Sequence, residues 1–347
     1  MVFPLRARVF IIWCAACFLN TAAQDAPRRF RLVELNVENL FDTVHDAGHD
    51  DYEFLPASPR RWESRRYWAK LGRLARLLAA CGGDRPADLV ALCEVENDSV
   101  LADLTRRTYL GALGYEFLIT RSADMRGIDV ALLYQPLRFR TLHTDHLRPP
   151  QPAGQSDERP LRDALHVAGL LPTGDTLDVF VCHLPSRAGG WRQTQPRRVR
   201  AATALRASID SVMHCRRIPM IVVAGDFNDE LRRRPLRTAL QIADMRGGIR
   251  PECLYDLAPC ATDARKVGGT YKFRNIWYTL DHILVSGTLL QAEASLRTGP
   301  GDCRIAAFPF QLEAGADGRL KPRRTYLGPH YRGGFSEHLT LVVDFWY

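Results

Sequence analysis

The sequence lacks a long apolar run, an internal repeat, a low-complexity tract and a flexible linker. An apolar stretch covers residues 9–19, but a transmembrane helix needs about 20 such residues, so we expect no membrane span. Without a repeat or a linker, nothing in the 347 residues marks a boundary between domains. The formal charge of +8 favours an anionic partner only weakly, because the arginines are spread along the chain.

The cysteines do not form the pattern of a disulfide framework or of a zinc site. Of the nine, seven come after residue 24, and this odd number leaves at least one thiol free. Cys93 and Cys182 lie in apolar, strand-like runs, where we predict buried side chains. Cys253 and Cys260 bracket a loop, and their pairing stays open. Zinc is disfavoured, because no Cys-x-x-Cys or paired Cys/His spacing occurs after residue 24.

Residues 1–24 have the pattern of a secretory signal peptide. Two arginines precede the apolar stretch, and small residues come after it, as is typical before a cleavage site. We therefore predict export to the periplasm or the extracellular space and one mature domain, residues 25–347. The alternative is a buried N-terminal strand or helix, but no helix or strand pattern links this segment to the residues after it. The residues before Cys17 fit a lipid anchor poorly, so we expect no anchor there.

Apolar and β-branched runs predict seven buried strands. They cover residues 30–37, 89–95, 128–134, 177–184, 218–224, 280–285 and 339–345. Apolar residues at helical spacing predict helices at 64–80 and 193–214. Strands also succeed one another without an intervening helix, as in 128–141 and 163–183, which argues against a doubly wound parallel sheet. We predict an α+β fold, a four-layer α/β/β/α sandwich of two mixed sheets flanked by helices.

Polar residues lie at the ends of the first two predicted strands. Asn36 is near the end of the first strand, and Glu94 is near the end of the second. An asparagine at a strand end is usually a turn or cap residue, and a single glutamate there is more often structural than catalytic. Buried polar groups are costly unless something pairs with them, so both residues are candidates for a site.

Two later strands end in residues that suit phosphate chemistry. His183, Ser186 and Arg187 lie at the end of one of them and can donate hydrogen bonds to phosphate oxygens. Asp226 and Asn228 lie at the end of the other, within a tight turn. There the acid can hold or deprotonate a water, and the amide can orient the water or a phosphate. These side chains predict a site for phosphoester chemistry.

Asp281 and the pair Glu337-His338 precede the last two predicted strands. An aspartate that is hydrogen-bonded to a histidine fixes the tautomer of the imidazole and raises its basicity. Taken alone, each residue is as readily explained as a buried core residue with a partner. The order of all six clusters along one chain is harder to explain without a shared site.

This order of clusters resembles the endonuclease/exonuclease/phosphatase superfamily over essentially the whole of residues 25–347. The resemblance implies that Glu94, with Asn36, binds a metal. Hard oxygen ligands favour Mg²⁺, with Mn²⁺ as a substitute. Glu337 stands where the family has aspartate, and its longer side chain can still reach a metal directly or through water.

The same resemblance implies roles for the other residues in metal-assisted, in-line attack of water on a phosphoester. Asp226 would position or deprotonate the water, and Asn228 would hold phosphate oxygens. His338, paired with Asp281, would carry positive charge against the transition state. Further donors would come from His183, Arg187 and Ser186.

Two further segments, 126–131 and 185–190, resemble an exported bacterial branch of the superfamily. The acidic segment 42–62 is a feature of that branch whose purpose cannot be derived from the residues. It contains His45 and His49, which leave a transition-metal site open, although histidines in loops are more often solvated.

The substrate stays open between two classes. Trp191, Trp277 and Tyr278 could stack on a nucleotide or pack in the core. A phosphomonoesterase, or a sugar- or lipid-phosphate esterase, would use the same catalytic residues with a different rim. No amphipathic membrane-inserting helix favours a lipid. We predict a phosphodiesterase or nuclease acting on an anionic phosphoester, with the phosphomonoesterase as the alternative.

A third hypothesis is a binding protein that has lost catalysis. Such a protein should lack at least one of four residues, all of which are present: Glu94, Asp226, Asn228 and His338. We expect no obligate protein partner and a monomer.

Overall fold

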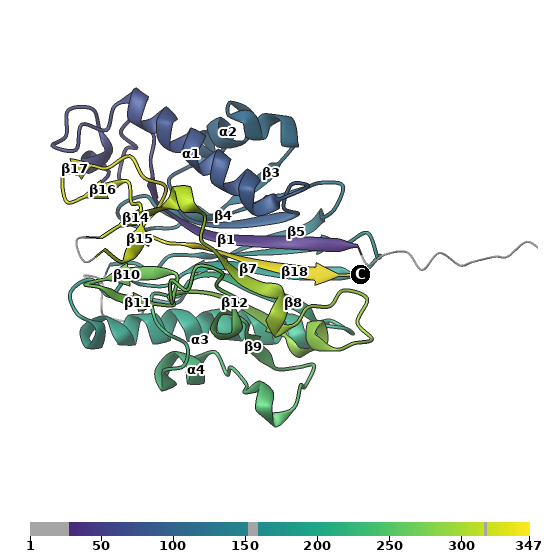
Figure 1. The fold of residues 1–347 in the computed structure, drawn as a ribbon. Helices are drawn as coiled ribbons and strands as arrows, with labels where there is room; N and C mark the ends of the chain where they lie inside the picture. The colour runs from purple at the N-terminus through teal and green to yellow at the C-terminus, as the bar shows by residue number, and fades with distance from the viewer. Residues whose placement is uncertain (1–27, 152–158, 316–317) are drawn as a thin grey trace, which may run out of the picture.

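The computed structural model describes residues 28–151, 159–315 and 318–347, so the predicted signal peptide lies outside the described residues. Two six-stranded sheets pack face to face, with helices on both outer faces (Figure 1). The predicted four-layer α/β/β/α sandwich is therefore confirmed. In the part of the chain that the structure describes, no helix is long and apolar enough to cross a membrane.

The first sheet contains the strands nearest the two ends of the described chain. Its order is β13 (Cys303–Ala306), β18 (Thr340–Trp346), β1 (Arg29–Leu40), β2 (Leu89–Val95), β4 (Asp129–Tyr134) and β3 (Glu116–Ile119). The β1–β2 pair is parallel, whereas the other pairs are antiparallel. The sheet is therefore mixed, as the sequence predicts.

The second sheet is built from the middle of the chain. Its order is β5 (Arg140–Leu147), β6 (Ala164–Leu170), β7 (Thr176–His183), β8 (Met220–Asp226), β12 (Asp281–Ser286) and β9 (Leu254–Asp256). Here β7 and β8 are the parallel pair. In each sheet one parallel pair thus lies among antiparallel strands, and the carboxyl ends of both parallel pairs carry predicted site residues.

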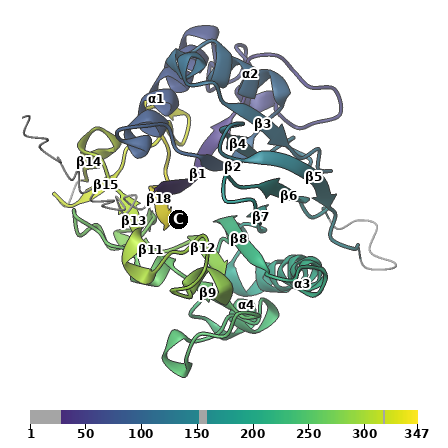
Figure 2. The ribbon, with the colours of Figure 1, turned by 90° about the vertical axis from the view of Figure 1, so that its right-hand side faces the viewer.

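Helices cover the outer faces of the sandwich (Figures 1 and 2). Helices α1 (Ser64–Gly82) and α2 (Asp98–Arg106) lie over the first sheet, and α3 (Trp191–Cys215) and α4 (Arg234–Ala239) lie over the second. The alternation of β1 explains this packing, because successive side chains of a strand point to opposite faces. Val33 and Leu35 pack in the apolar cluster under α1, whereas Phe30 and Leu32 pack between the sheets.

Three small hairpins gather at the end of the sandwich opposite the C-terminus (Figure 1). They are β10 (Tyr271–Phe273) with β11 (Ile276–Tyr278), β14 (Leu312–Ala314) with β15 (Leu320–Pro322), and β16 (Tyr326–Leu327) with β17 (His330–Tyr331). Strand β18 ends at the C-terminus and runs antiparallel to β1, so the hairpins surround the end of the sheets that carries Asn36. They have no clear signal in the sequence, because strands this short have little periodicity.

The seven cysteines of the described residues are free. The pairing of Cys253 with Cys260, which the sequence left open, is therefore absent from this structure. Cys93 and Cys182 are buried as predicted, and the Cys93 Sγ contacts the Cys182 carbonyl oxygen across the two sheets at 3.4 Å.

The acidic segment 42–62 contributes Phe54 and Trp62 to the apolar cluster under α1. Trp62 is almost fully buried and donates from its indole nitrogen to the Phe41 carbonyl at 3.0 Å. Phe54 stacks on Phe41 with 4.2 Å between the ring centroids. His45 is hydrogen-bonded to Asp51 through Nδ1 at 2.5 Å. These contacts give the segment a structural role in closing the core.

Candidate active site

Strand register brings three of the predicted residues side by side in the second sheet. His183 pairs with Asp226 across the parallel strands β7 and β8, and Asp281 pairs with Asp226 across the antiparallel strands β8 and β12. The carboxyl ends of the parallel pair β7 and β8 meet at one sheet edge, where strand ends commonly carry ligand sites. The first sheet supplies the opposite wall of this site.

The backbone of β2 is irregular at Glu94. The register between β2 and β4 shifts at Cys93/Val95, and Glu94 has a φ of +67°, which is uncommon for a residue other than glycine. Its Oε2 accepts a hydrogen bond from the Asn39 backbone nitrogen at 2.8 Å. The other oxygen, Oε1, lies 3.8 Å from His183 Nε2. The bulge thus presents a carboxylate to the gap between the sheets.

Asn36 connects the two sheets. Its amide nitrogen donates to Asp226 Oδ2 at 3.1 Å, and its amide oxygen accepts from the Glu38 backbone at 2.9 Å. The backbone carbonyl of Asn36 also accepts from the Ser336 hydroxyl at 2.6 Å. Sequence reasoning assigned Asn36 to a metal, but in this structure its clearest contact orients Asp226.

Asp226 is at the centre of the cluster. Its Oδ1 accepts from the Asn228 backbone nitrogen at 2.7 Å, and its Oδ2 lies 3.5 Å from His183 Nε2 and 3.9 Å from His338 Nε2. Burial raises the pKa of Asp226 to about 7, the positive charge of His338 opposes this rise, and the nearby Asp281 adds to it.

The turn after β8 requires a glycine at position 225. Gly225 has a φ of +149°, and a Cβ atom there would lie 1.9 Å from the Cys182 carbonyl oxygen. The nearby Asn228 has a φ of +50° and donates from its amide nitrogen to the Leu184 carbonyl at 3.0 Å. Close packing of backbone on backbone therefore fixes the positions of Asp226 and Asn228.

We expect Gly225→Ala to lower the free energy of unfolding by about 3 kcal/mol or more, because the new methyl group meets backbone that cannot move aside. Urea denaturation measures this loss. The matched control is Gly174→Ala, where φ is +89° and no atom lies within 4 Å of the added Cβ. This control should lose about 1–2 kcal/mol from backbone strain alone. Equal losses in the two variants would contradict the packing argument.

His338 is the charged member of the cluster. Its Nδ1 contacts Asp281 Oδ2 at 2.8 Å, and its backbone nitrogen donates to the Ser336 hydroxyl at 3.0 Å. Burial alone lowers the pKa of His338, but the negative charge of Asp281 and its hydrogen bond raise it to about 10. At neutral pH the imidazole is therefore protonated. Asp226, Asp281 and His338 lie close enough together to share a metal ion, and the negative charges of the two carboxylates raise the pKa of the imidazole.

His183 has the opposite charge state. Burial lowers its pKa well below the ordinary value, and the positive charges of Arg162 and Arg126 lower it further. Its Nδ1 is buried without a hydrogen-bond partner among the described residues. The site thus holds one neutral imidazole and one charged imidazole on either side of Asp226.

Arg187 supports the turn that carries Asn228. Its Nε donates to the Asn228 carbonyl at 2.7 Å, and its Nη2 donates to Asp229 Oδ1 at 2.7 Å. Ser186 accepts a hydrogen bond from the Ala188 backbone at 3.2 Å. Ser186 and Arg187 both line the pocket described below, and Arg187 uses two of its donors to hold the turn.

Glu337 lies in an ion pair that the sequence did not reveal. Its Oε2 contacts Arg324 Nη2, and the Arg324 Nε lies 3.7 Å from Glu38 Oε1. Thr325 fixes this arrangement, because its backbone nitrogen donates to Glu38 Oε2 at 2.7 Å. Glu337 therefore has an arginine partner where it lines the site.

A pocket of about 550 Å³ opens above the cluster. Its lining includes Glu94, His183, Asp226, Asn228 and His338 with the rim residues Ser186, Arg187 and Glu337, and it also includes residues that sequence reasoning did not assign: Asn39, Arg126, Arg162, Tyr271 and Phe273. Arg126 is next to Gly127 in a segment that the sequence singled out, whereas Arg162 and Tyr271 carried no signal. The Tyr271 ring lies 4.9 Å from the His338 ring.

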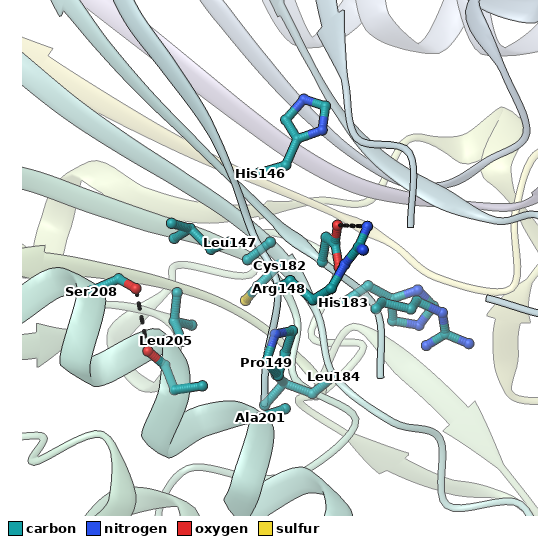
Figure 3. Close-up of a pocket in the computed structure, with 14 residues that line it drawn as sticks. His146, Leu147, Arg148, Pro149, Cys182, His183, Leu184, Ala201, Leu205 and Ser208 are labelled. Carbon is teal, nitrogen blue, oxygen red and sulfur yellow. Dashed lines mark hydrogen bonds and ion pairs between the residues drawn. The ribbon is translucent and has the colours of Figure 1, made fainter. Parts of the chain in front are cut away.

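A second cavity, of about 240 Å³, lies behind His183 (Figure 3). It extends between the ends of β5 to β7 and helix α3, and His183 and Arg162 line both this cavity and the pocket. Arg148 and Asp163 form an ion pair within it at 3.2 Å. His183 therefore lies between this cavity and the catalytic pocket.

A family profile and several solved structures resemble this chain. A sequence profile described as the Endonuclease/Exonuclease/phosphatase family matches residues 32–345. No curated protein matches the sequence. An endonuclease/exonuclease/phosphatase family protein from Bacteroides thetaiotaomicron matches at a TM-score of 0.59 and 14% identity, over 93% of this chain and 96% of that chain.

Two other solved structures have the same fold. The mannosyl-6-phosphatase of Bacteroides thetaiotaomicron VPI-5482 gives a TM-score of 0.60 and 14% identity, over 92% of this chain and 100% of that chain. TDP2 from D. rerio, complexed with single strand DNA product, gives 0.54 and 14%, over 91% of this chain and 98% of that chain. With the profile spanning nearly all of the described residues, the chain belongs to the endonuclease/exonuclease/phosphatase family.

Proposed function

We propose that this protein is an exported, monomeric, Mg²⁺-dependent phosphodiesterase whose substrate is nucleic acid. One observation carries the proposal. Asp226, Glu94, the neutral His183 and the charged His338 line a single pocket, and the buried Asp281 is hydrogen-bonded to His338. Phosphoester hydrolysis needs a carboxylate near a water, a cation site and a second positive charge, and this cluster supplies all three kinds of group.

The residues at the first sheet fit a hard divalent cation. Glu94 lines the pocket, and its Oε1 lies 3.8 Å from His183 Nε2, a separation longer than a hydrogen bond. The amide oxygen of Asn36 accepts one hydrogen bond and has a second lone pair. Glu94 with Asn36 would hold Mg²⁺, with Mn²⁺ as a substitute, and the ion would neutralise charge on phosphate oxygens. Glu337 would contribute only if it left Arg324.

Asp226 and Asn228 would act on the water and the phosphate. The Asp226 carboxylate, held by Asn36 and by the Asn228 backbone, would orient a water and accept its proton. The pKa of about 7 for Asp226 suits a general base at neutral pH. The Asn228 amide would donate to a phosphate oxygen in place of one of its present contacts.

His338 would stabilise the negative charge of the transition state. Its Nε2 faces Asp226, and its Nδ1 is held by Asp281, so the imidazolium has a fixed direction. A preorganised charge of this kind is among the largest contributions to catalysis. His183, Ser186 and Arg187 would supply further donors at the wall of the pocket.

The walls of the pocket favour a phosphodiester with large groups on both sides. Arg126 and Arg162 line one part of the pocket, whereas Tyr271, Phe273 and Tyr278 line another. Bases stack on aromatic side chains, and phosphates pair with arginines. The similarity to TDP2 solved with single strand DNA product supports this substrate class.

A phosphomonoesterase is the second candidate, because the fold is also similar to a mannosyl-6-phosphatase. The two candidates are told apart with plasmid DNA, bis-(p-nitrophenyl) phosphate and p-nitrophenyl phosphate in Mg²⁺. For a phosphodiesterase we expect cleavage of the DNA and of the diester and little release from the monoester. Activity on the monoester alone would support the phosphatase, and no turnover of any phosphoester would support the non-catalytic binding protein.

A further inference from the structure

An arginine-lined cavity adjoins the catalytic pocket. Its volume is about 340 Å³, and Arg126, Arg159, Arg162 and Arg197 are among its lining residues. Four residues, Arg126, Arg162, Ser186 and Ala188, line both this cavity and the catalytic pocket. The two hollows are therefore adjacent, and a ligand that extends past these shared residues would reach both of them. We call this cavity the arginine cavity.

Arginines predominate among the charged residues described at the arginine cavity. Among the described residues that line it, Asp124 is the one carboxylate, whereas Arg126, Arg159 and Arg162 each bring a guanidinium group. Asp124 Oδ2 pairs with Arg162 Nε at 2.9 Å, and its Oδ1 lies 4.0 Å from Arg126 Nε. Asp124 thus positions two arginines, whose guanidinium groups can pair with an anion.

Hydrogen bonds connect residues of the arginine cavity to the catalytic pocket and to helix α3. Arg126 Nη1 donates to the Asn39 side chain at 3.2 Å, and the Asn39 backbone donates to Glu94 at 2.8 Å. On the other side, Arg197 Nη2 donates to the Arg159 carbonyl at 2.6 Å. The field of these arginines also reaches the centre, because Arg162 and Arg126 help to lower the pKa of His183.

We infer that the arginine cavity binds a second phosphate group of the substrate while the first phosphate is held at Asp226 and Glu94. This inference deepens the proposed function and rests on it. The substrate would then be a molecule with at least two phosphates, in which a spacer such as a nucleoside joins the phosphate being cleaved to its neighbour. Arginine suits this role, because its planar guanidinium pairs with phosphate oxygens in a fork geometry.

Binding without catalysis tests this inference. Fluorescein-labelled thymidine di- and trinucleotides carry one and two internucleotide phosphates, and fluorescence anisotropy in EDTA gives Kd for each with the full chain. The unaltered chain should bind the two-phosphate ligand at least about tenfold more tightly, as expected for one added charge-assisted contact. In Arg159→Glu and in Arg162→Gln this preference should fall below about threefold.

The matched control is Arg140→Glu, which changes the net charge as Arg159→Glu does. Arg140 is exposed and pairs with Leu170 at the end of the second sheet remote from His183. This control should keep the preference for two phosphates. Equal Kd values for the two ligands with the unaltered chain, or a preference that survives in both cavity variants, would overturn the inference.

Competition identifies the source of the second phosphate. Thymidine 3′,5′-bisphosphate and fructose 1,6-bisphosphate present two phosphates on a nucleoside and on a sugar, respectively. Displacement by either one supports the site, and the stronger competitor gives the chemical class. Displacement by neither contradicts it. These readouts do not need turnover, so a chain that cleaves no phosphoester but keeps the preference for the two-phosphate ligand would refute only the proposed function.

Discussion

Asp226→Asn should lower kcat for hydrolysis of bis-(p-nitrophenyl) phosphate by about 10²–10⁴-fold, the range for loss of a general base. Asparagine keeps the shape of the side chain, and its one oxygen can still accept from either the Asn228 backbone or the Asn36 amide, although not from both. It cannot accept the proton of the attacking water. The expected loss therefore lies in kcat, whereas KM for the diester should change little.

The control for this prediction is Asp84→Asn. Asp84 is exposed and pairs with Arg29 at the start of β1, the opposite end of that strand from Asn36. It should leave kcat unchanged. Circular dichroism should show the same fold for both variants. A value of kcat within about threefold of the unaltered chain in Asp226→Asn would remove Asp226 from the mechanism, since even a weak general base contributes more than that.

Asp281→Asn should move the alkaline limb of the pH–rate profile to lower pH and lower kcat at neutral pH by about 10²-fold. The negative charge of Asp281 is the main cause that holds the pKa of His338 at about 10 against burial. Without that charge, burial favours the neutral imidazole. The profile of kcat against pH from 6 to 10.5, measured for both proteins, checks the shift.

The raised pKa of His338 also determines how the free energy of unfolding changes with pH. His338 has a higher pKa in the folded chain than the ordinary value of 6.5, so its protonation stabilises the fold fully below pH 6.5. This contribution is lost as the pH rises through about 10. Asp281→Asn should lose most of this stabilisation, which urea denaturation at pH 6 and pH 9.5 can measure.

For the kinetic prediction, superimposable pH–rate profiles of Asp281→Asn and the unaltered chain would show that His338 does not act as a cation.

Much of the fold can be predicted from local patterns in the sequence. The run Leu89–Val95 is short and almost continuously apolar, as expected of a strand that is buried on both faces, and helix α1 shows the amphipathic spacing expected of its bounds Ser64–Gly82. The residues of the site centre are also predicted, from the order of polar clusters at strand ends, and strand register brings His183, Asp226 and Asp281 together. These are properties of neighbouring residues and of regular pairing.

The parts that sequence reasoning missed depend on contacts between distant segments. Arg324 reaches Glu337 and Glu38 only because the β16–β17 hairpin region folds over the end of β1. Arg126 and Arg162 meet around Asp124 from the segments that precede β4 and β6, which belong to different sheets. Such ion pairs leave no periodicity and no spacing in the sequence, so they appear only once the fold is known.

Hydrolysis of phosphodiesters by the cluster around Asp226, with a divalent cation at Glu94, is tested most directly by plasmid nicking. The rate is measured for the unaltered chain against Mg²⁺ concentration, with EDTA as the zero point. We predict no nicking in EDTA and saturable recovery when Mg²⁺ is restored. Nicking that continues at the same rate in EDTA, or that stays absent at every Mg²⁺ concentration, would contradict this mechanism.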